Sequence, residues 1–93
     1  MLRVFKIPLG VDCVGIPMPT GAKILSVQVQ RGQPCVWVLC NPEAKPATRK
    51  LRVYGTGHEL PDNPGTFVGT FQLEDGQLVF HVFDEGHTFD NEG

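Results

Sequence analysis

The sequence lacks several features that define large classes of proteins. It has no run of eighteen apolar residues and no apolar core at its N-terminus, so we expect neither a transmembrane helix nor a signal peptide. Its three cysteines, Cys13, Cys35 and Cys40, show no zinc or iron–sulfur spacing. Cys35 and Cys40 are five positions apart on one predicted strand, so their side chains point to opposite faces and do not pair. We expect a cytosolic protein with reduced thiols, no metal and no other cofactor.

Basic residues are absent from the second part of the chain. All eight lie between Arg3 and Arg52, together with only two acids, Asp12 and Glu43, so this segment carries +6. Residues 53–93 hold eight acids and no base, or −8, which leaves −2 for the whole chain. Two interpretations stay open. The segments interleave their charges on folding, or the particle is bipolar, with one anion-attracting face and one acidic face.

Long helices are not expected, because eleven glycines and eight prolines, which break helices, are spread over 93 residues. The 41% apolar content nevertheless favours an ordered globule, and the length allows one domain. Apolar and polar residues alternate with a period of two almost throughout, which predicts strands. We therefore predict an all-β fold, a small antiparallel sandwich or barrel-like single domain over residues 1–93, with an acidic C-terminal tail over about 84–93. A lone Phe89 in this tail is expected to anchor it or to contact a partner.

The predicted strands are bounded by turn residues. A bulge or strand start is expected near Ile24, which breaks the alternation in which Leu25, Val27 and Val29 share one face. Hairpins are predicted at residues 31–33 and, through Asp-Gly, at 74–76. A short helix in 42–48 or 59–64 stays open. The strands are expected at residues 2–7, 24–30, 35–40, 49–54, 66–73 and 77–83, with a short extended piece at 16–18.

The segment Tyr54-Gly55-Thr56-Gly57-His58 is the richest in groups that bind ligands. It begins a long connection, residues 55–65, and long connections are disproportionately functional. Consecutive N–H groups at a glycine turn can form an anion-binding concavity. The hydroxyl, the imidazole and the nearby Arg52, which shares a strand face with Tyr54 and Lys50, add polar groups. The structural alternative is a tight turn that needs positive φ at one or both glycines.

Other chemistry-bearing residues have structural explanations as well. Trp37 lies in a strand that is apolar on both faces, so a core position is expected, although an open ring would stack on bases. The stripe of Ser26, Gln28 and Gln30 is expected on the solvated face of a sheet. His81 is expected to be a satisfied histidine under a sheet. A catalytic pair with His58 stays open, but no carboxylate has the spacing to orient either ring, so we expect no enzyme.

Several blocks of the chain together resemble a family of small tailed-bacteriophage and prophage proteins. They are the blocks around Gly21-Ala22 and Gln28, the Gly32-Gln33-Pro34-Cys35 run before Trp37, the Gly-Thr-Gly-His turn, Gly69-Thr70-Phe71-Gln72, and residues 78–83. The similarity spans about residues 2–84. It implies a phage origin and expression in the host bacterial cytoplasm, but no reaction.

By analogy with small phage proteins that counter host immunity, we expect a non-catalytic, homo-oligomeric protein that sequesters a nucleotide-derived immune signal. The ligand would be a small nucleotide-like anion of the cyclic nucleotide or cyclic ADP-ribose type, with no membrane and no long nucleic acid as partner. The expected binding residues are Trp37, Arg52, Tyr54, Gly55, Thr56, Gly57 and His58. Three alternatives stay open: a protein–protein inhibitor that uses its acidic C-terminal face, a small nucleotide hydrolase, and an assembly accessory.

Overall fold

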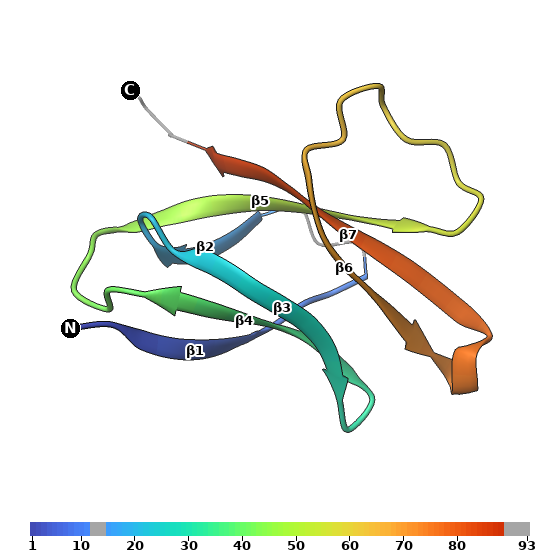
Figure 1. Ribbon diagram of the computed structural model, residues 1–93, viewed down its shortest axis with the longest axis horizontal. Coiled ribbons are helices and arrows are strands. Elements are labelled where there is room, and N and C mark those ends of the chain that lie inside the picture. Colours follow the sequence, from blue (N-terminus) through green and yellow to red (C-terminus); the bar gives the residue numbers. More distant parts are fainter. Residues whose placement is uncertain (12–14, 89–93) are drawn as a thin grey trace.

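The computed structural model describes residues 1–11 and 15–88 (Figure 1). Asp12, Cys13, Phe89 and the remaining acidic tail, residues 90–93, lie outside the described residues, so the expectations on them are not addressed. Seven strands and one 3₁₀ turn form the described part of the chain. They are β1 (Arg3–Pro8), β2 (Gly15–Pro19), β3 (Lys23–Gln30), β4 (Gln33–Cys40), β5 (Pro46–Gly55), β6 (Thr66–Leu73), η1 (Glu74–Gly76) and β7 (Leu78–Thr88).

The strands form two antiparallel sheets, which confirms the all-β prediction. Sheet A has the order β1-β4-β3, and sheet B has the order β2-β5-β7-β6. In Figure 1 the long red strand β7 runs between β5 and β6. β4 is the central strand of sheet A, as expected for a strand that is apolar on both faces.

The core lies between the two sheets and is built from alternate residues of each strand. Sheet A contributes Val27, Val36 and Val38, and sheet B contributes Leu51 and Val82, all of them buried. Cys40 belongs to this cluster, whereas Cys35 is buried on the opposite face of β4; both thiols are free, as predicted.

A bulge in β3 changes the face that was predicted for its first half. The pairing with β4 shifts between Ile24 and Ser26, which confirms an irregularity near Ile24. As a result Ile24 packs against the core, and Leu25, which was expected to share a face with Val27, is 46% exposed. The prediction for Leu25 was wrong because one inserted residue reverses the alternation on its N-terminal side.

One further expectation fails in the structure, and one open alternative is decided. Strand β7 continues five residues past the predicted end, so Asp84 lies within a strand and not in a tail. No helix forms in 42–48 or 59–64, since β5 begins at Pro46 and residues 59–64 are irregular. The hairpin at 74–76 is confirmed; Glu74 and Asp75 both have positive φ there, and Gly76 follows at φ +89°.

The two sheets are in contact where β3 meets β6. A Cβ atom placed on Gly69 would lie 2.7 Å from Cγ1 of Val27, so only glycine fits there without a shift. A second link between the sheets starts from Arg49 of β5. Within sheet B its Nε donates to Oδ1 and Oδ2 of Asp84 at 2.9 and 3.2 Å, and its Nη2 donates to Oδ2 at 2.7 Å. Its third nitrogen, Nη1, donates to the carbonyl oxygen of Ala22 just before β3.

Candidate functional site

The turn after Tyr54 is tight, and its backbone amides are largely used. The Thr56 N–H donates to the Val79 carbonyl at 3.1 Å, and the His58 N–H donates to the Gly55 carbonyl at 3.1 Å. The expected concavity of consecutive free N–H groups is therefore wrong for these two amides. Of the two glycines, only Gly57 has positive φ, at +87°. Gly55 lets the His58 ring lie close to the backbone: a Cβ there would lie 2.9 Å from Cε1 of His58 and would displace the ring.

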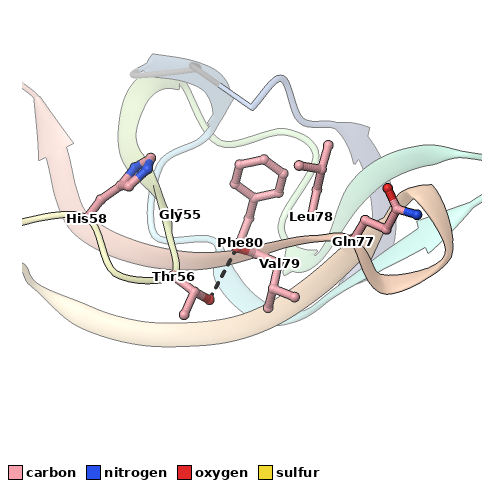
Figure 2. Close-up of a pocket in the computed structure, with 7 residues that line it drawn as sticks. All are labelled: Gly55, Thr56, His58, Gln77, Leu78, Val79 and Phe80. Carbon is pink, nitrogen blue, oxygen red and sulfur yellow. Dashed lines mark hydrogen bonds between the residues drawn. The ribbon is translucent and has the colours of Figure 1, made fainter.

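His58 lines a cavity of about 300 Å³ at the end of sheet B. Figure 2 shows its ring and that of Phe80 on one side of the sheet, and the side chains of Thr56 and Val79 on the other. The cavity is lined by Gly55, Thr56, His58, Gln77, Leu78, Val79 and Phe80. The polar side-chain groups of this lining are the His58 imidazole, the Thr56 hydroxyl and the Gln77 amide. The lining contains no lysine and no arginine. The cavity is therefore poorly suited to holding a phosphate.

The opposite side of sheet B, here called the outer face, carries the other predicted residues. Arg52, Tyr54 and Lys50 alternate on β5 with Leu51 and Val53, which face the core. The strand register places His81 directly between Tyr54 of β5 and Thr70 of β6. The outer face is defined by Lys50, Arg52, Tyr54, Thr56, Phe67, Thr70, His81, Phe83 and Glu85.

The His81 ring is held at both nitrogens by hydroxyl groups. Its Nε2 lies 2.7 Å from Oγ1 of Thr56, and its Nδ1 lies 2.9 Å from Oγ1 of Thr70. Because a hydroxyl can donate or accept, both hydrogen bonds persist in either neutral tautomer and in the imidazolium form. His81 is thus satisfied, as expected. No local pattern indicates its partners, because Thr56 and Thr70 are 25 and 11 residues away along the chain.

Three aromatic rings form a cluster on the same face as this histidine. Phe83 makes edge-to-face contacts with Tyr54, at 5.8 Å between ring centroids, and with Phe67, at 5.5 Å. Phe67 is 57% exposed, so the cluster opens to solvent at its β6 end. An open aromatic cluster beside hydroxyl and imidazole groups presents both stacking surface and hydrogen-bonding groups.

The basic groups of the outer face share one carboxylate. Lys50 Nζ lies 3.6 Å from Oε1 of Glu85, and Arg52 Nε lies 3.3 Å from Oε2. The Arg52 Nε atom is buried, and the contact with Glu85 is a charge contact, since this N–H donates no hydrogen bond to any described residue. Two cations thus face one anion. Where β5 meets β7, opposite charges interleave, as the first interpretation of the charge pattern predicted.

The predicted site residues do not form one pocket. Arg52, Tyr54 and Thr56 share the outer face of sheet B, whereas His58 lies on the other side of the sheet and Trp37 lies in sheet A. A catalytic pair of His58 and His81 is excluded by the same geometry. Among the described residues, no group of three His, Cys, Asp or Glu side chains is placed to hold a metal ion.

These features define a small two-sheet β protein with a polar and aromatic outer face on its larger sheet. The chain belongs to a family described as a domain of unknown function, DUF7352, whose model matches residues 1–92. No curated protein and no solved structure matches it. The part of the chain that the structure describes contains no helix of the length and apolarity that a membrane crossing requires.

Proposed function

We propose that this protein binds a small nucleotide-like anion on the outer face of sheet B and releases it chemically unchanged. The observation that supports this most is the convergence of Arg52, Tyr54 and His81 on one open face, where two cations, Arg52 and Lys50, share a single carboxylate. A phosphate would pair with Arg52 and Lys50. The rings of Tyr54, Phe83 and Phe67 offer surface for a base, and the Thr56 and Thr70 hydroxyls suit a sugar edge.

The proposed biological role is sequestration of an immune signal by a phage protein in the host cytoplasm. It rests on the resemblance to phage proteins, and the ligands to test first are cyclic dinucleotides and cyclic ADP-ribose isomers. Phe67 is exposed next to this face, so a second copy that covered it would bury ring surface and close the site. We therefore propose a homo-oligomer with ligand sites at or near the interface.

Calorimetry tests the proposal directly. Each ligand is titrated into the full chain and into Arg52→Gln and Tyr54→Leu variants, with Lys23→Ala of sheet A as a charge control. A charge-assisted hydrogen bond contributes about 1.5–3 kcal/mol, so Arg52→Gln should weaken binding about tenfold or more. Lys23→Ala should leave the affinity unchanged. An absence of heat with every ligand, or equal affinity in all variants, contradicts the proposal.

Hydrolysis is a second candidate, because the Thr56 hydroxyl lies within hydrogen-bond distance of an imidazole. A histidine can act as the general base for such a nucleophile. The Nδ1 side of His81, however, meets a hydroxyl instead of the carboxylate that would stabilise an imidazolium. Chromatography of the ligand after incubation separates the two: an intact ligand recovered on heating supports binding, and a cleaved one supports hydrolysis.

The acidic-face inhibitor is less well supported by the described residues. Asp84 is paired with Arg49, and Glu85 lies against Lys50 and Arg52. Both carboxylates are therefore already neutralised within the chain and are poor decoys for a basic partner.

A further inference from the structure

The face of sheet A that points away from the core carries the only tryptophan of the chain. Trp37 pairs with Lys6 of β1 and Ser26 of β3, so these three side chains form one row across the sheet. The core residues Val36 and Val38 flank Trp37 along β4 and point the other way. The expected core position of Trp37 was wrong, because a strand that is apolar on both faces was assumed to be covered on both.

Polar side chains continue this row along β3. Gln28 pairs with Cys35, and Gln30 pairs with Gln33, which places both glutamines on the same side as Ser26. Gln28 and Gln30 are exposed, and the Lys6 ammonium donates to the Gln30 amide oxygen. We call this surface the Trp37 face, defined by Lys6, Lys23, Ser26, Gln28, Gln30 and Trp37.

Sheet A differs from sheet B in having bases without acids. Its three strands contain Arg3, Lys6 and Lys23 and no aspartate or glutamate, and Arg31 lies in the turn between β3 and β4. No ion pair in the described part of the chain involves any of these four residues. Sheet A therefore carries basic residues that no acid of its own strands offsets.

A half-buried indole, two glutamine amides and unpaired lysines are the components of a surface that binds unstacked nucleotides. An aromatic ring stacks on any base, glutamines donate to and accept from base edges, and lysines neutralise phosphates. We propose that the Trp37 face binds single-stranded nucleic acid, with one base stacked on Trp37 and the backbone running past Lys6 and Lys23. The proposal goes beyond the small-ligand site, lies on the other sheet, and departs from the sequence-based expectation that no long nucleic acid binds.

A second copy of this chain is a less suitable occupant. If two Trp37 faces met around a two-fold axis, lysines of like charge would be brought together without a carboxylate on either sheet. A polyanion instead matches the charge of the whole face. The surface is three strands wide, or about 10 Å between its outer strands, so it covers only a few nucleotides and its affinity should depend strongly on salt.

The single tryptophan provides the readout. The full chain is titrated with oligo-dT and oligo-U of fifteen nucleotides, and with a duplex of the same length for comparison. Tryptophan emission and the fluorescence anisotropy of a labelled oligonucleotide are recorded. We expect quenching by either or both single strands, weaker binding to the duplex, and a loss of affinity as salt increases. Unequal affinity for the two single strands identifies the sugar that the face prefers.

Variants assign the binding to this face. Stacking on an aromatic ring is worth about 1–3 kcal/mol, so Trp37→Leu should weaken binding about fivefold to a hundredfold, whereas Trp37→Phe should retain much of it. Lys6→Ala/Lys23→Ala should weaken binding and flatten the salt dependence, and Lys45→Ala, an exposed lysine outside the strands of sheet A, is the matched control. Arg52→Gln should have no effect, which separates this proposal from the small-ligand site.

Three outcomes would overturn the proposal. One is unchanged affinity in a folded Trp37→Leu variant, as judged by its circular dichroism. Another is equal binding of the duplex, which would indicate charge attraction alone. The third is a decrease in tryptophan emission per molecule as the protein concentration is raised in the absence of oligonucleotide. This would indicate that a second copy covers the face.

Discussion

The Nε2 atom of His81 lies 2.7 Å from the hydroxyl oxygen of Thr56, and this contact joins the middle of β7 to the turn that ends β5. Thr70 of β6 holds the other ring nitrogen at 2.9 Å, so one side chain connects three segments of sheet B. In the strand register Tyr54 lies opposite His81, and Arg52 lies opposite the next outer-face residue of β7, Phe83. A rigid imidazole is thereby positioned within the proposed anion site.

The first prediction concerns this hydrogen-bonded ring. Thr56→Val removes a partner of a half-buried nitrogen, and we expect the free energy of unfolding to fall by about 1 kcal/mol. Thr56→Ser keeps the hydroxyl and should cost less. Urea unfolding of both variants and of Thr70→Val measures the difference. Equal stability of the serine and valine variants would show that the hydrogen bond contributes nothing.

The second prediction concerns Glu85, which competes with an anionic ligand for Lys50 and Arg52. Glu85→Gln should raise the affinity for a nucleotide-like anion about twofold to fivefold, since exposed ion pairs are worth about 0.2–1 kcal/mol. Calorimetry measures the change. The matched control is Glu43→Gln, which removes an equal charge from the connection between β4 and β5. Equal gains in both variants would point to net charge and not to this site.

The third prediction concerns the ion pair of Arg49 and Asp84, whose side chains are each 13% exposed. Arg49→Met leaves the carboxylate without its main partner, and we expect a loss of about 3 kcal/mol in the free energy of unfolding. Arg49→Met/Asp84→Leu should recover part of that loss, because no unpaired charge stays buried. The single variant Asp84→Leu completes the comparison. If the double variant loses as much free energy of unfolding as the two single variants lose together, this explanation is contradicted.

The fourth prediction concerns the contact between Gly69 and Val27. Gly69→Ala places a methyl group 2.7 Å from Cγ1 of Val27 and should destabilise the protein by about 1–3 kcal/mol. Val27→Ala makes room for that methyl group but costs stability of its own. In Val27→Ala, adding Gly69→Ala should therefore cost less than it does in the original chain. Thermal unfolding of the original chain, the two single variants and the double variant tests whether this contact sets how closely the two sheets pack.

Much of the fold follows from local patterns. The alternation of residues 66–73 predicts β6 with its observed bounds, and Asp-Gly predicts the hairpin before β7. The predicted end of β7 failed because Asp84 and Glu85 are charged, which suggested a tail. In the structure the two carboxylates are neutralised by Arg49, Lys50 and Arg52 of the neighbouring strand. The residue pattern within a single strand does not show which charges lie on the strand beside it.

The candidate site was only partly predictable. The alternation of side chains along β5 correctly predicted that Lys50, Arg52 and Tyr54 share one face, since successive side chains of a strand point to opposite sides. It did not reveal that His58 folds back over Gly55 to the other side, because a turn with positive φ at Gly57 ends the alternation. Nor did it reveal Thr70 as a neighbour of His81, because strand pairing brings them together.

The sequence by itself determined that this chain forms antiparallel strands, where its hairpins lie and which side chains of one strand share a side. Steric preferences and turn chemistry act over a few residues, so they can be recognised in the order of the amino acids. Only the tertiary structure decided which side is covered. The second sheet packs on Val36 and Val38 and leaves Trp37 half-buried outside the core, and the order β2-β5-β7-β6 brings Tyr54, His81 and Thr70 together. Both depend on how much apolar surface each arrangement of the whole chain buries.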